Sequence, residues 1–177
     1  IPKRMRWGGG SAEFVRPVHW LVMLFGSEVV PAEILGVTSG ASTYGHRFHA
    51  PDPIRLSEPA EYVERLEREG KVIASFARRR ELVRQQVDQA AAAVAGEAVI
   101  EPELLDEVTA LVEWPVALTG RFEDAFLEVP AEALISSMQG HQRYFPIRRA
   151  DGELMPAFVT VANIDSRDPD VVRAGNE

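Results

Sequence analysis

The sequence predicts an α+β fold: a mixed or antiparallel sheet with about four helices packed on it, in a single compact domain. Short apolar runs typical of strands come first, helical patterns follow, and strand-like runs return towards the end. The 177 residues suffice for one domain, and no internal repeat, low-complexity run or long linker divides them. We therefore expect a single domain over residues 1–177.

The first part of the chain is predicted to form strands. Residues 20–25 are an apolar run, and residues 28–37 resume it around Pro31, so we expect a β-hairpin with an edge strand or a bulge. Residues 43–48 are a predicted third strand. The cluster Pro51-Asp52-Pro53 is a predicted turn, since proline and aspartate favour turn geometry.

Two predicted helices follow. Ser57 is the expected N-cap of the first, which ends at Gly70. Ser75 is the expected N-cap of a long helix that runs to about Ala95 and ends at Gly96. The long helix presents one apolar face at helical spacing, formed by Phe76, Val83, Val87, Ala90, Ala91 and Val94.

The second half alternates helices and strands. Further helices are predicted over residues 102–112 and 130–139. The predicted strands cover residues 116–122, 144–149 and 157–163, with a hairpin turn at 150–153. Residues 169–177 look like the first turns of a following helix.

Composition excludes several classes of protein. The net charge of −8 is concentrated in residues 51–140, which hold nine basic and eighteen acidic side chains, so the chain is not a general nucleic-acid binder. No apolar stretch approaches the roughly 20 residues that a membrane helix needs. The absence of cysteine excludes disulfides and thiolate metal sites, and fits a reducing cytoplasm.

Two short stretches combine glycine, histidine, arginine and aromatic residues, at 43–48 and at 137–146. Such clusters can stack on planar groups and bond phosphates or base edges. If the two stretches meet in the fold, they form a near-neutral to basic face outside the acidic middle. The candidate contact residues, for RNA or for another subunit, are Tyr44, His46, Arg47, His141, Gln142, Arg143 and Tyr144. The alternative is that each stretch is a structural turn, with its arginine paired to an internal acid such as Glu113 or Asp165.

These residues also belong to a longer series of motifs. The others lie at residues 1–8, 14–20, 111–116, 129–134, 161–165 and 175–177. In this order and spacing the series closely resembles the β subunit of the bacterial tetrameric glycyl-tRNA synthetase, from end to end of the chain. One departure is Arg143, where the family often has lysine before Tyr144 and Phe145; the charge is kept and its geometry changes.

The resemblance implies one internal region of a longer, cytoplasmic chain that supports the joining of glycine to tRNA. It implies tRNA contact, subunit architecture or both, with no catalytic residue and no cofactor in this region. ATP and magnesium would be bound by the α subunit of the holoenzyme, so we expect the isolated fragment not to be catalytic. The implied partners are the α subunit, the remainder of the β subunit and tRNA, with no membrane or DNA.

Two alternatives stay open. The region is similar in kind to the editing-type domain of the phenylalanyl-tRNA synthetase β chain, so it could hydrolyse mischarged tRNA; a pocket for glycine excludes larger amino acids sterically, which weakens the need for editing. It could also be a purely structural module. A mischarged-tRNA hydrolysis assay distinguishes an editing enzyme from a region that is not an enzyme. Salt-dependent tRNA binding distinguishes an accessory region that contacts tRNA from a purely structural module.

The remaining histidines and arginines are interpreted as structural residues. His46 and His49 would point to opposite faces of a strand, which argues against a shared metal ion. His141 lacks an evident nucleophile and orienting group, so a helix-end histidine is favoured over a general base. The arginines at 78–80 and Arg84 are interpreted as a solvated helix face eased by Glu81.

Overall fold

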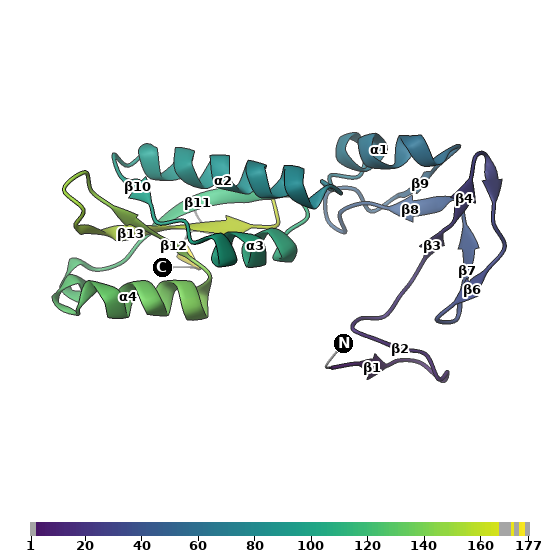
Figure 1. Ribbon diagram of the computed structural model, residues 1–177, viewed down its shortest axis with the longest axis horizontal. Helices are drawn as coiled ribbons and strands as arrows, with labels where there is room; N and C mark the ends of the chain where they lie inside the picture. Colours follow the sequence, from purple (N-terminus) through teal and green to yellow (C-terminus); the bar gives the residue numbers. More distant parts are fainter. Residues whose placement is uncertain (1–2, 167–170, 172–173, 176–177) are drawn as a thin grey trace. The chain divides into compact units, whose positions relative to one another are not determined.

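The computed structural model describes residues 3–166, 171, 174 and 175 (Figure 1). Contacts divide the chain into two compact units, unit 1 (Ile1–Val72) and unit 2 (Ile73–Glu177), and each is described by itself. Both contain helices and strands, so the predicted α+β class is confirmed. The organisation as one domain stays a prediction.

Unit 1 is built mainly from short paired strands. Its strands are β1 (Met5–Arg6), β2 (Glu13–Phe14), β3 (Leu21–Val22), β4 (Leu24–Phe25), β5 (Glu28–Val29), β6 (Glu33–Ile34), β7 (Val37–Gly40), β8 (Ser42–Tyr44) and β9 (Pro53–Arg55). β4 and β5 pair antiparallel, which confirms the hairpin expected after the first apolar run. β7 pairs parallel with β3 and antiparallel with β6, so this small sheet is mixed.

The expected strand over residues 28–37 is wrong in one respect, because a second tight turn divides it. Leu35 and Gly36 both have positive φ, 55° and 78°, between the antiparallel strands β6 and β7. Two consecutive positive φ values match the twist of a tight hairpin. Leucine rarely takes this conformation, so the residue type carried no turn signal.

The helix of unit 1 begins differently from the prediction. A 3-10 turn, Pro59–Glu61, leads into α1 (Tyr62–Arg68), and the residue before the turn is Glu58. Ser57 is therefore not the N-cap; its backbone N–H donates to Glu61 Oε2 at 2.9 Å. A 3-10 turn is common at the ends of α-helices. Here it places the N-cap at Glu58, one residue after the predicted Ser57.

Unit 2 is organised around one antiparallel sheet. Its strands are β10 (Glu97–Ala98), β11 (Val116–Arg121), β12 (Phe145–Arg148) and β13 (Leu154–Ala162), in the order β10-β12-β13-β11. The three longer strands confirm the predictions, although β13 begins earlier than residue 157. β10 is two residues long and was missed, because so short a segment shows no alternation.

Helices cover both faces of this sheet (Figure 1). α2 (Phe76–Ala92) and α3 (Pro102–Leu111) enclose the main core with one face, and α4 (Ala131–Ser137) packs with the residues of the other. β13 serves both, since Ala157 and Val159 enter the main core while Phe158 enters the second cluster. This alternation is the period of two expected of a strand covered on both sides.

The long helix α2 follows its predicted pattern closely. Ser75 caps it, with its side chain accepting a hydrogen bond from the Arg78 backbone N–H at 3.3 Å. Val83, Val87 and Ala91 are fully buried, which confirms the apolar face. Phe76 is 44% exposed, so its assignment to that face is wrong. As the first helical residue it precedes the part of the helix that lies on the core.

Two stretches of the resemblance series meet in unit 2. The Asn163 side-chain oxygen accepts hydrogen bonds from the backbone N–H groups of Glu113, at 2.7 Å, and Trp114, at 3.0 Å. This joins the end of β13 to the segment that leads from α3 into β11. The contact fixes the sheet edge through one amide side chain.

The end of the chain is only partly described. The helix predicted over residues 169–177 falls largely on residues outside the described ones. Among the residues that the structure describes, no helix has both the length and the apolar character needed to cross a membrane.

Candidate functional site

Residues 137–146 connect α4 to β12 through a π-helical turn, Met138–Gln142. The turn ends at Arg143, which is left-handed at φ 61° and donates its backbone N–H to the Met138 carbonyl. The helix predicted over residues 130–139 was expected to stop at Gly140, and this is wrong: Gly140 is helical, and a Cβ there would meet no atom within 4 Å. Since π-turns occur frequently at functional sites, this segment is a candidate contact site.

Arg143 attaches the end of the turn to α3. Its Nε donates to Glu107 Oε1 at 2.6 Å, and its Nη1 donates to the carbonyl oxygens of Gly140 and, at 3.5 Å, of Gln139. A cation here satisfies carbonyl groups that lack partners at a helix C-terminus. The acidic partner is Glu107 rather than Glu113 or Asp165. These contacts favour the structural alternative for Arg143.

The next two polar side chains of the stretch face solvent. His141 and Gln142 are exposed, and within the described part of the chain neither side chain makes a hydrogen bond or ion pair. Tyr144 is half-buried and stacks on Phe158, with ring centroids 4.2 Å apart and 4° between the planes. Burial raises the pKa of the Tyr144 phenol. One face of that ring is thus already occupied, whereas His141 and Gln142 are available to a partner.

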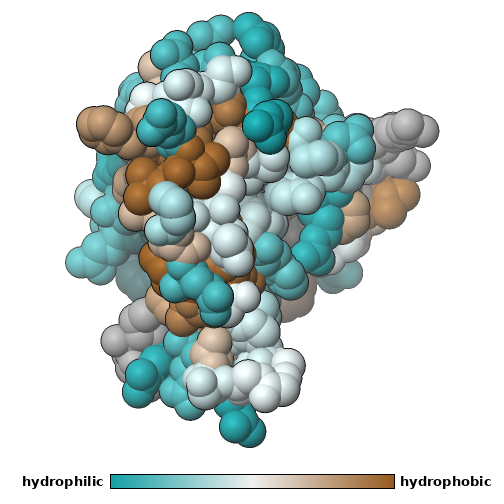
Figure 2. Space-filling view, turned by 90° about the vertical axis from the view of Figure 1, so that its right-hand side faces the viewer, coloured by the Kyte–Doolittle hydropathy of each residue, from teal (hydrophilic) through white to brown (hydrophobic). Residues whose placement is uncertain are grey.

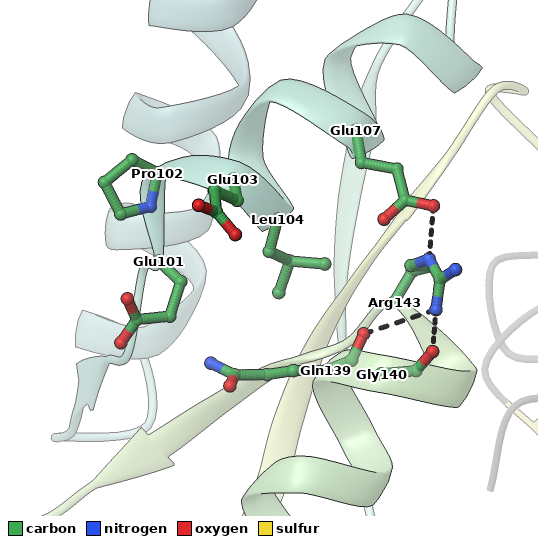
Figure 3. A pocket seen from close by; sticks show the side chains of 8 residues that line it. All are labelled: Glu101, Pro102, Glu103, Leu104, Glu107, Gln139, Gly140 and Arg143. Atoms are coloured by element: carbon green, nitrogen blue, oxygen red, sulfur yellow. Dashed lines mark hydrogen bonds and ion pairs between the residues drawn. The ribbon is translucent and has the colours of Figure 1, made fainter.

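A pocket of about 490 Å³ lies beside the π-turn (Figure 3). It is lined by Glu101, Pro102, Glu103, Leu104, Glu107, Gln139, Gly140 and Arg143. The first turns of α3 form one wall and the π-turn forms the other (Figure 3). The Arg143–Glu107 ion pair closes one end, so the same contact shapes both the turn and the pocket.

The chemistry of this pocket is mixed. Three glutamates line it, and in the described residues the buried Gln139 Nε2 has no hydrogen-bond partner. A buried amide left unpaired costs about 1–3 kcal/mol, which an oxygen acceptor placed there would recover. The carboxylates favour donors or cations and disfavour phosphate. The pocket itself therefore does not suit a phosphate group.

The first glycine–histidine stretch, in unit 1, is built by a close backbone approach. A Cβ on Gly45 would overlap the backbone of Gly70, and the His46 N–H donates to the Gly70 carbonyl at 2.7 Å. Gly70 in turn is close to Leu66, whose carbonyl oxygen would lie 2.7 Å from an added Cβ. The absence of a side chain on Gly70 therefore allows the two backbone segments to come close. Lys71, and not Gly70, takes the left-handed conformation after α1, with φ 53°.

His46 organises the turn that follows. Its side chain is 2% exposed, and Nδ1 accepts hydrogen bonds from the backbone N–H groups of Phe48, at 3.2 Å, and His49, at 3.3 Å. The predicted strand over 43–48 therefore ends at Tyr44, because these bonds fold the backbone into a turn. A side chain this buried cannot reach a ligand while the turn is closed, so the position of His46 does not support a direct contact.

The other two candidates of this stretch are accessible. Tyr44 is 40% exposed and lies against Trp20, with ring centroids 4.8 Å apart. Arg47 is exposed, and among the described residues its side chain makes no hydrogen bond or ion pair. Because this stretch and residues 137–146 belong to different units, their union in one face stays a prediction.

The histidine pair needs a correction. His46 and His49 do not point to opposite faces, since the turn brings their rings to 4.5 Å between centroids. In the described ranges, no group of three or more histidine, aspartate or glutamate side chains is placed to hold a metal ion. His46 and His49 contact each other as part of the turn around Nδ1 of His46.

The arginines of α2 are engaged by neighbouring groups. Arg79 donates to the carbonyls of Thr109, at 2.9 Å, and Ile73. Arg80 pairs with Asp106, and Arg84 pairs with Glu81 at 2.8 Å and Asp88 at 2.9 Å. The expectation that Glu81 eases this face is confirmed for Arg84, while Arg79 is a structural link between α2 and α3.

Glu107 and Gln139 were missed by sequence reasoning. A glutamate in the middle of a polar helix face and a glutamine near a helix end are ordinary residues, so their types gave no signal. What makes them notable is that α3 lies beside the π-turn in the fold. The spacing from Glu107 to Arg143 is 36 residues, beyond the reach of local patterns.

Comparisons with known proteins give a consistent result. A family model described as "Glycyl-tRNA synthetase beta subunit" matches residues 1–177. The chain is 58% identical over 177 residues to the glycine–tRNA ligase beta subunits of Hahella chejuensis and of Azotobacter vinelandii. It is 56% identical to that of Chromohalobacter salexigens. Each match covers 100% of this chain and 26% of the relative, so the chain spans about a quarter of the length of these proteins.

Proposed function

Because the chain belongs to the glycyl-tRNA synthetase beta subunit family, we propose that it is an accessory region of a glycine–tRNA ligase beta subunit. In this role it helps to shape the subunit and contributes contacts to tRNA during aminoacylation with glycine. Its partners are the alpha subunit, the remainder of the beta subunit and tRNA. Activation of glycine with ATP and magnesium belongs to the alpha subunit.

The proposed tRNA contact is supported by the exposed side chains of His141 and Gln142. They lie on a turn whose backbone is fixed by the contacts of Arg143. The Arg143–Glu107 ion pair and the carbonyl contacts of Arg143 fix the turn, so the two side chains are presented with little freedom of the backbone. Imidazole and amide groups bond phosphate oxygens and the edges of unpaired bases. A preorganised polar pair of this kind suits RNA that is already oriented by a larger surface.

Arg47 is the second element of the proposed contact. It is exposed, without a side-chain partner in the described part, and follows the buried His46 that shapes its turn. A guanidinium that is not paired within the protein can form a charge-assisted bond to a phosphate. Arg68, also in unit 1, offers a contrast, because it is bound to Glu64 at 3.0 Å and Glu69 at 2.8 Å.

The proposal favours contact over catalysis. A general base needs an orienting group and a nucleophile within hydrogen-bond reach. Within the described residues the exposed His141 side chain bonds neither a serine nor a carboxylate. Its chemistry therefore supports hydrogen bonding to a partner.

Binding of tRNA by the full enzyme tests the proposal. Arg47→Ala and the double change His141→Ala with Gln142→Ala should weaken tRNA binding several-fold in a fluorescence anisotropy titration. Arg47→Ala should also reduce the slope of log affinity against log salt by about one phosphate contact. The matched control is Arg68→Ala, which removes an arginine already paired within unit 1 and should leave the slope unchanged.

Three outcomes separate the alternatives. Unchanged tRNA affinity and salt slope in the Arg47 and His141–Gln142 variants would reject the contact and leave architecture as the role. Hydrolysis of mischarged tRNA that is lost with His141→Ala would support the editing alternative. Loss of aminoacylation with normal tRNA binding would place the defect in subunit assembly.

Arg143→Ala has a different expected result. Because Arg143 satisfies helix-end carbonyls and pairs with Glu107, its loss should lower the free energy of unfolding by about 1–2 kcal/mol. Thermal melting measures this, and the salt slope of tRNA binding should stay at the parent value. A changed slope with normal melting would instead show that Arg143 contacts tRNA, as the sequence suggested.

A further inference from the structure

Unit 1 leaves an unusual share of its apolar side chains in contact with solvent. Of the exposed large hydrophobic residues in the described chain, twelve lie in unit 1 and five in unit 2. The buried apolar residues show the opposite distribution, with Ala41, Ile54, Leu56 and Leu66 in unit 1 and fifteen in unit 2. Where such side chains form a contiguous patch, they mark a site of interaction.

Part of this surface is concave. A groove of about 500 Å³ is lined by eight residues, among them Trp20, Leu21, Leu24, Leu56 and Tyr62. Trp20 and Tyr62 remain 42% and 38% exposed. Figure 2 shows hydrophobic residues gathered in patches on the face that it draws. The groove therefore offers large apolar side chains around a hollow that another apolar group can fill.

The strands beneath the groove need support. β3 and β4 are two residues long, and β4 is paired only with β5 in the described sheets. A two-stranded hairpin in water is marginally stable without packing on a third layer. Covering Trp20 and Leu24 would supply that layer, because burial contributes about 25 cal/mol for each Å² of apolar surface removed from water.

Charge indicates a protein occupant. None of the eight lining residues is charged, and residues 1–72 hold nine basic and nine acidic side chains. RNA binding draws most of its affinity from cations that neutralise phosphates, and the groove offers none. An apolar polypeptide segment is complementary to it.

We propose that this groove is the docking surface for an apolar segment of the same polypeptide, outside the 177 residues. The curated relatives are about four times longer than the chain, which covers 26% of each, so most of such a subunit is available to cover the groove. A segment of the same chain has a high effective concentration. Permanent interfaces are also the most apolar class.

This inference rests on the proposed architectural role and names its surface and partner. It places the contact in unit 1, on a face defined by Trp20 and Tyr62, and no residue of the turn that follows Tyr44 lines this groove. The groove inference and the proposed tRNA contact can fail separately. A different occupant of the groove would overturn the inference while leaving the tRNA contact and the accessory role intact.

Photocrosslinking in the complete enzyme tests the occupant. A benzoylphenylalanine is placed at Trp20 or Tyr62 of the full-length beta subunit, and the crosslinked peptides are identified by mass spectrometry. Subunits with ordinary and heavy nitrogen are mixed before assembly, so that crosslinks within one chain differ from those between two copies. Val63 is the matched control, because it follows Tyr62 on α1 and is 49% exposed but does not line the groove.

The expected result is a crosslink from Trp20 and Tyr62 to one region of the same chain beyond these 177 residues, at least several-fold above the yield from Val63. Crosslinks to the alpha subunit, to a second beta subunit or to tRNA would overturn the proposal. So would yields from both groove positions that do not exceed that of Val63.

Discussion

Among the described residues, unit 1 has nine short strands and one α-helix, whereas unit 2 has four strands and three α-helices, and the two units hold together differently. Unit 2 encloses two apolar clusters, one on each face of its antiparallel sheet. Unit 1 buries few apolar residues, and two of its most buried side chains are the polar Thr43 and His46. Unit 2 therefore draws on its own core, whereas unit 1 relies on close backbone contacts and on surfaces that another part of the protein can cover.

The same contrast separates the two glycine–histidine stretches. In unit 1 the glycine is required by the approach of Gly70, and the histidine is buried against its own turn. In unit 2 Gly140 has open space around it, and His141 is exposed. Similar residue types thus serve a structural turn in one place and an accessible surface in the other. Packing, and not composition, makes the difference.

The largest expected effect comes from the core of unit 2. Val87 is fully buried in the main cluster, so Val87→Asp would place an unpaired carboxylate there and lower the free energy of unfolding by about 3–5 kcal/mol. Thermal melting should show a decrease of more than about 6 °C. Gln89→Asp on the exposed side of α2 is the control, with a shift near zero. Equal melting temperatures for the two variants would break the comparison, since unit 2 would then not depend on this core.

A smaller effect, of opposite sign in the two units, is expected from the glycines. Gly45→Ala should destabilise by about 1–3 kcal/mol, because the new methyl group overlaps the rigid backbone of Gly70. Gly140→Ala meets nothing within 4 Å in a helical segment and should stabilise by up to about 1 kcal/mol. Denaturant unfolding of the two variants checks the signs. Destabilisation by both would mean that the π-turn also requires its glycine.

The smallest effect concerns the surface of α1 in unit 1. Hydrogen bonds from Arg65, and then from Arg68, lower the pKa of Glu69 from its usual 4.5 to about 2. Since the folded-state pKa is depressed, the stabilisation is present above pH 4.5 and is lost as the pH falls towards 2. The group is exposed and screened by salt, so the change should be slight.

An NMR titration of the Glu69 carboxyl carbon measures this pKa directly. Arg65→Lys keeps the charge but removes the two-pronged contact, in which Arg65 Nε and Nη2 lie 3.0 and 2.8 Å from the carboxylate oxygens. The variant should therefore move the pKa of Glu69 upward, towards 4.5. An unchanged value would show that Arg68 alone holds the carboxylate in its charged form.

Local pattern determined much of unit 2. The apolar spacing of Val83, Val87 and Ala91 predicted the buried face of α2, and Ser75 predicted its start, because helix periodicity and capping depend on residues within a few positions of each other. Proline at the start of α3 and the turn at 150–153 were equally local signals. The strands β11, β12 and β13 followed from their apolar runs.

Tertiary structure alone decided the partners. Arg143 meets Glu107, and Gly45 meets Gly70, only because the backbone brings together segments 36 and 25 positions apart in the sequence. The burial of His46 and the exposure of His141 depend on these contacts, although both histidines follow a glycine in the sequence. The physical reason is that periodicity and turn chemistry act within a few residues, whereas burial and ion pairing depend on whichever groups the completed fold places alongside.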